Sequence, residues 1–322
     1  MDHLAVLTSG GDAPGMNACL RAIVRSASNK KIKVSGIYNG YEGLIEDSFS
    51  ELKPREVGNI IQRGGSIIQT SRSKRFLDKK YRKQAIDNLS KRKINSVIVI
   101  GGEGSLKGAK HLGEEGTINV LGLPATIDRD LPLVGPTIGF DTAINTALQA
   151  IDRIRDTAST SNTVHIVEVM GRACGWISLI AGIGGGAEAV ILPEFPTDLE
   201  KLAQQIKEQR SFGKQGCILI VSEGACNSNG GEGLIKDLNE VSDFDLRITK
   251  LGHIQRGGNP SAVDRVLASR LGAEAVDCLM LGYKQCVLAQ PNGKIITIPF
   301  GELFGRLDSE MQDYYELIYK LA

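Results

Sequence analysis

Three loops, each directly after a short aliphatic run, carry the residue types that phosphate chemistry requires. They are residues 8–17 (TSGGDAPGMN), 101–105 (GGEGS) and 124–130 (PATIDRD). Glycines between a strand and a helix let backbone N–H groups approach an anion, and the helix N-terminus adds a favourable dipole. The first loop is not a Walker A loop, because Met16 stands where that motif requires lysine. Each glycine loop, taken alone, also fits an ordinary tight turn.

Carboxylates stand in the second and third loops. Glu103 lies between two glycines, from where it could reach a phosphate-bound Mg²⁺, and Ser105 can cap the next helix or bind phosphate. Asp128 and Asp130 lie two residues apart after an aliphatic run, which is unfavourable unless they bind metal or handle protons. The alternative is a solvated acidic loop braced by Arg129.

Arginines beside turns supply the positive charge that an anionic ligand needs. Arg72 lies in TSRS, Arg172 in EVMGR and Arg256 in GHIQRGG, with Arg247 just upstream of the last. Any one of them alone is best explained as a surface residue. Together, next to glycine-rich or strand-end turns, they form the arrangement expected for phosphate recognition.

The elements that position these loops are short buried strands alternating with amphipathic helices. The predicted strands are residues 4–7, 34–38, 96–100, 120–123, 164–169, 189–192 and 218–221. Helical apolar stripes run through Ile144 to Ile154, Leu199 to Ile206 and Val266 to Leu279. Such alternation predicts open, mainly parallel α/β sheets, which bind ligands in the loops at the carboxyl ends of their strands. The best sequence signal for a domain boundary is residues 136–139.

Bulk properties exclude several classes of protein. The 322 residues predict one large or two medium domains. A net charge of +1 gives no reason to expect nucleic acid or an anionic membrane as partner. The six cysteines contain no CxxC pair and the four histidines are off zinc spacing, so neither a disulfide scaffold nor a zinc cluster is expected. We see no signal peptide and no membrane span, and we expect a cytoplasmic protein.

Nine blocks occur in one order along nearly the whole chain. They are LTSGGDAPGMNA, QRGG, IGGEGS, TIDRD, IGFDTA, RIRDTAS, VEVMGR, LGHIQRGG and DRVLASRLGA. In this order they resemble the bacterial ATP-dependent 6-phosphofructokinases (phosphofructokinase type A). The resemblance implies two similar Rossmann-like domains, a larger ATP-binding one of residues 1–138 and 255–304 and a smaller fructose 6-phosphate-binding one of residues 139–254 and 305–322. It also implies phosphorylation of fructose 6-phosphate to fructose 1,6-bisphosphate, the committed step of glycolysis.

The resemblance assigns roles to matching positions. Asp128 would be the catalytic base, acting with Thr126, Arg72 and Arg172, and Mg²⁺ would enter with ATP beside Glu103. ATP would contact Gly11, Arg72, Ser73, Gly102, Glu103, Gly104 and Ser105. The sugar phosphate would contact Thr126, Ile127, Asp128, Asp130, Met170, Gly171, Arg172, Glu223, Arg247, His253, Ile254, Gln255 and Arg256. Positioning, charge neutralisation and a base are what phosphoryl transfer requires.

Two further expectations come from the resemblance. Pyrophosphate-dependent relatives typically carry Asp and Lys where this chain has Gly104 and Ala125, so ATP is the expected donor. Family members are homotetramers with a nucleotide diphosphate effector site between subunits. That site would use Arg21, Arg25, Arg155, Glu188 and Lys214, with Phe212 and Pro54 in place of two usually basic residues.

Three active-site positions depart from the family pattern. Glu103 replaces an Asp, Arg129 an Asn beside the base, and Thr163 an Arg that reaches the 6-phosphate of a neighbouring subunit. These changes leave open a catalytically weak or regulatory paralogue that binds nucleotide and sugar phosphate, and Thr163 alone leaves open a kinase for another sugar phosphate. The GGEGS loop also resembles NAD and lipid kinases, but the MGR and HIQRGG blocks argue against them. Trp176 is expected to pack at an interface.

Overall fold

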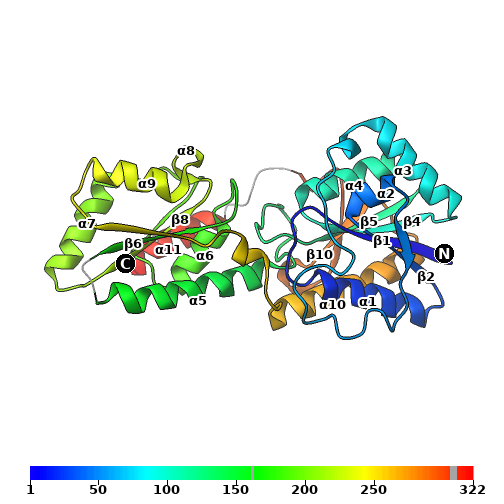
Figure 1. Ribbon diagram of the computed structural model, residues 1–322, viewed down its shortest axis with the longest axis horizontal. Coiled ribbons are helices and arrows are strands. Elements are labelled where there is room, and N and C mark those ends of the chain that lie inside the picture. Colours follow the sequence, from blue (N-terminus) through cyan, green and yellow to red (C-terminus); the bar gives the residue numbers. More distant parts are fainter. Residues whose placement is uncertain (161–162, 305–309, 322) are drawn as a thin grey trace. The chain divides into compact units, whose positions relative to one another are not determined.

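The computed structural model describes residues 1–160, 163–304 and 310–321 (Figure 1). The chain forms two compact units, a first unit of residues 1–142 and 256–307 and a second unit of residues 143–255 and 308–322. The first boundary lies four residues beyond the predicted 138/139, because Asp264 of the first unit accepts hydrogen bonds from the backbone of Gly139 and Thr142. The second lies one residue beyond the predicted 254/255, and the predicted 304/305 boundary borders residues outside the described part.

The first unit contains a seven-stranded sheet. Its strands are β1 (His3–Ser9), β2 (Lys33–Ile37), β3 (Phe49–Glu51), β4 (Ser96–Gly101), β5 (Asn119–Pro124), β10 (Cys286–Ala289) and β11 (Ile296–Pro299). Their order is β11-β10-β5-β4-β1-β2-β3. The five inner strands are parallel and the two edge strands antiparallel. The four strands predicted here are confirmed, while β3, β10 and β11 were not predicted, because each has only three or four residues.

Helices cover both faces of this sheet. They are α1 (Met16–Asn29), α2 (Gly40–Ile45), α3 (Lys79–Lys91), α4 (Glu103–Glu115) and α10 (Ala262–Met280), with short turns η1 (Arg75–Leu77) and η3 (Pro291–Gly293). In Figure 1, α1 and α10 lie side by side on one face, and α2, α3 and α4 lie on the other. A Cβ at Gly272 would lie 2.6 Å from the Cys19 carbonyl, so glycine permits the close approach of α10 to α1. Val266 was wrongly included in the apolar stripe of α10: it is 59% exposed, whereas the adjacent Leu267 is buried.

The second unit has a smaller, fully parallel sheet. Its strands are β6 (Val164–Val169), β7 (Ala189–Ile191), β8 (Cys217–Ser222) and β9 (Leu246–Lys250), in the order β7-β8-β6-β9. The remaining helices are α5 (Phe140–Ala158), α6 (Trp176–Gly184), α7 (Leu199–Ser211), α8 (Ala225–Ser228), α9 (Gly230–Asn239), α11 (Glu310–Leu321) and the turn η2 (Gly252–Arg256). The prediction of mainly parallel α/β sheets is therefore confirmed. β9 was not predicted, because it alternates exposed and half-buried residues at the sheet edge.

All six cysteines are free thiols; five are buried and Cys226 is half-buried. None of the helices in the described part of the chain combines the length and apolarity that a membrane crossing requires.

Candidate active site

The three loops of the first unit follow neighbouring strands. β5, β4 and β1 are adjacent, and the register pairs Ser9 with Gly101 and Gly101 with Pro124. The loops therefore start side by side at the carboxyl edge of the sheet. This is the edge at which open α/β sheets bind ligands.

The glycines of the first two loops allow very close backbone approach. Gly10 has a φ of 89°. A Cβ at Gly101 would lie 2.6 Å from the carbonyl oxygen of Ser9, and a Cβ at Gly10 would lie 3.0 Å from Oγ of Ser105. The space beside Gly104 is different, because no atom lies within 4 Å of a Cβ built there. The two loops are thus packed against each other at their base and leave open space over the first turn of α4.

Asp128 is buried in the third loop, where it is 1% exposed. Its backbone N–H donates to Oγ1 of Thr126 at 3.1 Å, which fixes the turn that carries it. Its Oδ1 lies 3.8 Å from Nη2 of Arg256, and the Arg256 guanidinium also donates to the carbonyl of Asp12 at 3.4 Å. A Cβ at Gly11 would lie only 2.5 Å from Nη1 of Arg256. The first loop, the third loop and Arg256 therefore form one tightly packed group around a carboxylate.

Arg129 and Asp130, the charged residues that follow Asp128 in the third loop, have contacts of their own. Arg129 has a left-handed backbone, with a φ of 50°, and its guanidinium lies 5.7 Å from the ring centre of Phe140. Thr126 Oγ1 lies 3.5 Å from Oδ1 of Asp130. The sequence suggested Arg129 as a cation beside Asp128. The structure places a cation from a distant part of the chain, Arg256, 3.8 Å from Oδ1 of Asp128.

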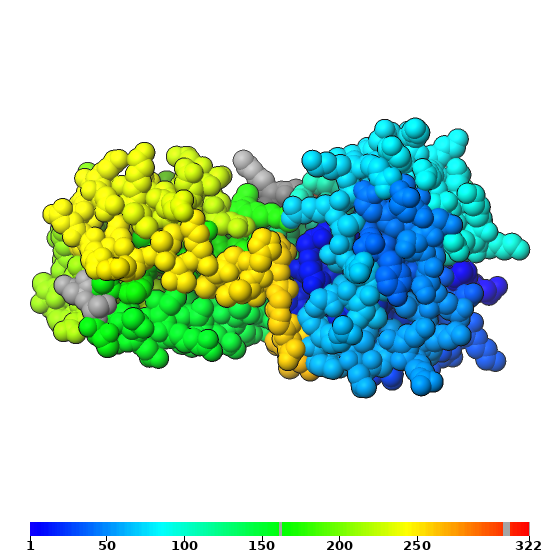
Figure 2. Space-filling model, viewed as in Figure 1, coloured from blue at the N-terminus to red at the C-terminus, as the bar shows by residue number. Residues whose placement is uncertain are grey.

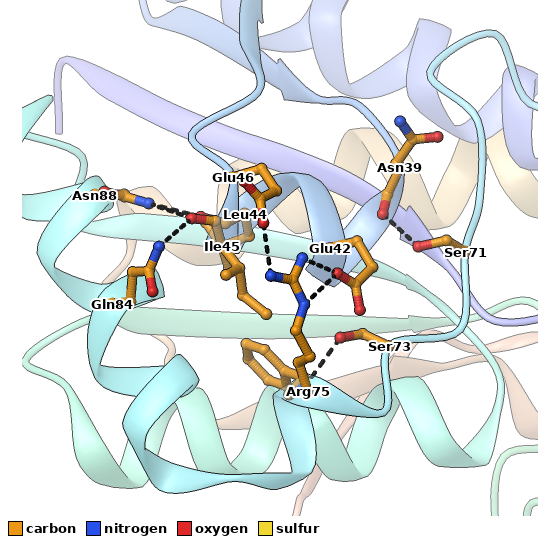
Figure 3. Close-up of polar contacts among 11 residues, drawn as sticks. Asn39, Glu42, Leu44, Ile45, Glu46, Ser71, Ser73, Arg75, Gln84 and Asn88 are labelled. Atoms are coloured by element: carbon orange, nitrogen blue, oxygen red, sulfur yellow. Dashed lines mark hydrogen bonds and ion pairs between the residues drawn. The ribbon is translucent and has the colours of Figure 1, made fainter.

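The segment that carries Arg72 runs next to the first loop. The backbone N–H of Gly10 donates to the carbonyl of Ser71 at 3.3 Å, and the Ser71 hydroxyl donates to the carbonyl of Asn39 (Figure 3). Arg72 itself is exposed and makes no side-chain hydrogen bond or ion pair within the described residues. Ser73 accepts a hydrogen bond from the N–H of Phe76 in η1. Arg72 is therefore available for a ligand, whereas the Ser73 hydroxyl already has a structural contact.

The hydrogen bond at Ser73 belongs to a cluster that fixes α2 against η1. Figure 3 shows the Arg75 guanidinium between the carboxylates of Glu42 and Glu46, which it binds as ion pairs. The pKa of the Glu42 carboxyl is lowered by hydrogen bonds from Arg75 and, less strongly, from Ser73. The segment that carries Arg72 is therefore held in place by ion pairs as well as by backbone hydrogen bonds.

Glu103 lies in the first turn of α4 and pairs with Lys107, with 2.6 Å between Oε1 and Nζ. Both side chains are substantially exposed, so this is a weak ion pair that a ligand can displace. No group of three or more His, Cys, Asp or Glu side chains among the described residues could hold a metal ion by itself. A single carboxylate fits a Mg²⁺ that arrives with phosphate oxygens, because Mg²⁺ is often bound by one or two carboxylates plus substrate phosphates.

The second unit carries the other predicted sugar-phosphate residues. β6 and β8 are adjacent, with Val169 paired with Ser222, so the loops after them start together. The backbone N–H groups of Gly171 and Arg172 donate to the same oxygen, Oε1 of Glu223, at 3.2 and 2.8 Å. Gly171 has a φ of 143° and Arg172 a φ of 54°. Glu223 therefore holds the strained turn that presents the exposed Arg172.

The remaining residues of this set lie in the same unit. Gln255 is fully buried, and its Oε1 accepts from the N–H of Met170 at 2.9 Å. His253 and Ile254 are exposed on η2, and Arg247 on β9 lies 3.2 Å from Asp245. The predicted site residues are thus divided: those numbered up to 130, and Arg256, lie in the first unit, and the others lie in the second.

Comparison with known proteins decides the family. A sequence model of the family Phosphofructokinase matches residues 3–279. The ATP-dependent 6-phosphofructokinase of Natranaerobius thermophilus is 44% identical over 322 residues, which is all of both chains. That of Staphylococcus aureus is 45% identical over 325 residues, again covering both chains completely. This chain belongs to the phosphofructokinase family.

The fold agrees with the sequence relationship. A T-state crystal structure of Pichia pastoris phosphofructokinase superposes with a TM-score of 0.92 at 32% identity, over 99% of this chain and 39% of that chain. The prediction of a phosphofructokinase fold from nine sequence blocks is confirmed.

The predicted effector residues of this phosphofructokinase fall into two groups. In the second unit, Glu188 is buried and its Oε1 lies 2.8 Å from Nζ of Lys214 and 3.8 Å from Nη1 of Arg155. Arg21 and Arg25 lie on α1 of the first unit. The two cations of the second unit thus share one carboxylate.

Thr163, one of the departures from the family pattern, and Trp176 are both buried. Thr163 is 8% exposed just before β6, and its carbonyl accepts from the N–H of Cys217 at 3.2 Å. Trp176 is 2% exposed and packs edge-to-face on Tyr314 with 5.7 Å between ring centres. The expectation that Trp176 packs at an interface is wrong for this chain by itself, because the side chain is already buried within the second unit.

Sequence reasoning missed two buried polar residues that organise the site. Asn17 is fully buried, donates to the carbonyls of Arg63 and Gly65 and accepts from the N–H of Ile67. Asp264 is 1% exposed, and the N-terminal segment of α5 donates to both its oxygens. Both residues lie inside quoted sequence blocks, but nothing in a block distinguishes a positioning residue from one that contacts substrate.

Proposed function

We propose that this phosphofructokinase transfers the γ-phosphoryl group of MgATP to the 1-hydroxyl of fructose 6-phosphate. The observation that carries the proposal is Asp128, a buried carboxylate fixed by Thr126 beside Arg256, at the edge where the loops of β1, β4 and β5 start together. Two full-length relatives, each called an ATP-dependent 6-phosphofructokinase, support the same reaction.

Each part of the site has a role in this reaction. Asp128 accepts the proton of the attacking hydroxyl, and Arg72 and Arg172 neutralise charge on the phosphates. Glycine backbone of the first two loops and the N-terminus of α4 bind the ATP phosphates. Glu103 would be the carboxylate that holds Mg²⁺ or its waters when it is bound with ATP, where the metal would neutralise phosphate charge.

ATP is the proposed donor because Gly104 leaves open space over the first turn of α4, where no atom lies within 4 Å of an added Cβ. An aspartate at this position would fill part of that space with a carboxylate. We further propose a homotetramer located in the cytoplasm, with a nucleotide diphosphate effector bound near Arg155, Glu188 and Lys214. Arg21 and Arg25 are proposed to complete that site.

A steady-state assay tests the reaction. Purified protein is given fructose 6-phosphate with MgATP or magnesium pyrophosphate, and Asp128→Ser serves as the blank. We expect turnover with MgATP about 10²–10⁴-fold faster than the Asp128→Ser blank. Turnover equal to the blank, with both substrates still bound, would establish the regulatory paralogue instead, and faster turnover with pyrophosphate would refute the donor assignment.

A further inference from the structure

Residues 63–71 of the first unit form a segment without helix or strand that leads directly into Arg72. Figure 2 shows the lighter blue of this part of the chain at the surface of the unit, beside the dark blue of the N-terminal residues. Such a segment has no regular ladder of backbone hydrogen bonds of its own, so the groups that bind it from outside decide its path. The position of Arg72 therefore depends on those groups.

Thr8 binds this segment three residues before Arg72. Thr8 is fully buried near the carboxyl end of β1, and its Oγ1 donates to the carbonyl of Gln69 at 2.7 Å. The same Oγ1 lies 2.8 Å from Oγ of Ser66. Since the single hydroxyl hydrogen of Thr8 goes to Gln69, Ser66 is the donor in the second contact. One buried hydroxyl therefore connects both ends of the turn at residues 66–69.

Gln69 has a backbone conformation that needs such support. Its φ is 60°, in the left-handed region that residues other than glycine rarely adopt. Strained residues of this kind persist when the surrounding contacts fix them. The N–H of Gln69 donates to the carbonyl of Ser66 at 3.1 Å, and Thr8 binds the Gln69 carbonyl. Removal of the Thr8 hydroxyl takes away the donor to this carbonyl and frees the turn to relax.

The contacts of the segment advance in step with the first loop. Two residues after the contact of Thr8, in both chain segments, the N–H of Gly10 donates to the carbonyl of Ser71 at 3.3 Å. The residues that come next are Gly11 and Arg72, which are both assigned to ATP. The contact at Thr8 therefore aligns the cation with the glycine loop.

We propose that Thr8 is a positioning residue for phosphoryl transfer, which holds the turn at Gln69 so that Arg72 reaches the phosphates of ATP. The inference rests on the proposed function, in which Arg72 neutralises phosphate charge. A guanidinium must lie within hydrogen-bond distance of a phosphate oxygen to do so, and a small displacement weakens the contact. Because the Arg72 side chain is exposed, its place is set by the backbone that carries it.

The test is a double-mutant cycle read as kcat/KM for MgATP. Thr8→Val removes the hydroxyl and keeps the branched shape, and it should lower kcat/KM about tenfold. In the background of Arg72→Ala the same substitution should change kcat/KM by less than about twofold, because no guanidinium remains to be positioned. Thr8→Ser restores the hydroxyl and should keep most of the wild-type value.

Ser35→Ala is the matched control. Ser35 carries a buried hydroxyl on β2, next to β1, and its Oγ lies 2.8 Å from Nε2 of His3. This variant should have normal kcat/KM, and thermal melting measures the stability of each protein. If valine at position 8 prevents folding, Thr8→Ala takes its place in the cycle with the same expectation.

An equal fold-loss from Thr8→Val in both backgrounds would overturn the inference, because Thr8 would then act independently of Arg72. Thr8→Ser as defective as Thr8→Val would overturn it as well, since the hydroxyl would not be the group that acts. Neither result touches the proposed reaction. Full kcat/KM in Arg72→Ala would instead refute the phosphate role of Arg72, and with it the inference that rests on that role.

Discussion

Two carboxylates that the sequence assigns to the same substrate have different surroundings in the two units. Asp128 of the first unit is buried, and its Oδ1 lies 3.8 Å from the guanidinium of Arg256. Glu223 of the second unit accepts two hydrogen bonds from the backbone of Gly171 and Arg172. The first carboxylate is held through its backbone, whereas the second uses its own side chain to hold another loop.

This difference separates a residue that reacts from one that positions. A general base must keep a carboxylate oxygen within reach of the substrate proton, and the hydrogen bond from the Asp128 N–H to Thr126 fixes the turn without using that carboxylate. Glu223 instead stabilises a turn in which both Gly171 and Arg172 have positive φ. Substitution of Asp128 should therefore lower kcat, whereas substitution of Glu223 should raise KM.

The largest effect is expected from Asp128→Asn. The amide has nearly the same shape but cannot accept the proton, so kcat should fall about 10²–10⁴-fold. KM for fructose 6-phosphate should change little, because the turn set by Thr126 is kept. Initial rates at varied sugar phosphate separate the two constants. A variant with normal kcat and raised KM would show that Asp128 only binds.

A smaller effect, on KM rather than on kcat, is expected from Glu223→Ala. Loss of the acceptor for the Gly171 and Arg172 N–H groups releases the turn, and each charged hydrogen bond contributes about 1.5–3 kcal/mol. We therefore expect KM for fructose 6-phosphate to rise about tenfold to a hundredfold. Glu223→Gln keeps a carbonyl acceptor and should restore most of the affinity. If Gln is as defective as Ala, Glu223 acts through its charge on the substrate and not through the turn.

The sequence predicted the central strands and the loops well for a simple physical reason. β1, β4, β5 and β8 are buried on both faces and so consist mainly of apolar residues. Parallel strands bring their carboxyl ends to one edge, which is why the loops at residues 8–17, 101–105 and 124–130 start together. The edge strands β3, β9 and β11 are short or half-exposed, so their patterns are weak.

The sequence could not show which polar residues contact substrate and which hold another part of the chain in position. Whether Glu223 meets a substrate or the N–H of Arg172, 51 residues earlier in the chain, depends on the packing of two loops. The same holds for Arg256, whose guanidinium lies at Gly11 and Asp128 although the three are far apart in the sequence. Residue type reports the chemistry that is possible, and tertiary contacts decide which group performs it.

Gly11→Ala tests the packing around Asp128 without touching its carboxylate. The new Cβ would lie 2.5 Å from Nη1 of Arg256, so the guanidinium must move. We expect kcat/KM for fructose 6-phosphate to fall about tenfold, the cost of one weakened charged contact. Gly257→Ala is the matched control, because no atom lies within 4 Å of a Cβ there and its activity should be near normal. Equal activity of the two variants would show that the close approach of Arg256 to Gly11 does not contribute to catalysis.

An effect on stability rather than on rate is expected at Asp264, a positioning carboxylate of the first unit that resembles Glu223. It accepts hydrogen bonds from the N–H of Gly139 at 2.9 Å and of Thr142 at 2.8 Å. Asn has one acceptor oxygen in place of two, so Asp264→Asn should lower the free energy of unfolding by about 1–3 kcal/mol. Urea unfolding of both proteins measures this difference, and an unchanged midpoint would show that the start of α5 is held by other contacts.

The pH dependence of that difference has a definite sign. Burial raises the folded-state pKa of Asp264 above its ordinary 3.8, and the hydrogen bonds from Thr142 and Gly139 oppose this shift without cancelling it. The folded protein therefore binds a proton before the unfolded chain does, so wild type gains stability relative to Asp264→Asn as pH falls toward 3.8. The stability deficit of Asp264→Asn should thus be larger at pH of about 5 than at pH of about 7. Asp152→Asn, on the exposed side of α5, should show no such change, and an equal trend in both variants would mean that Asp264 does not titrate as a buried acid.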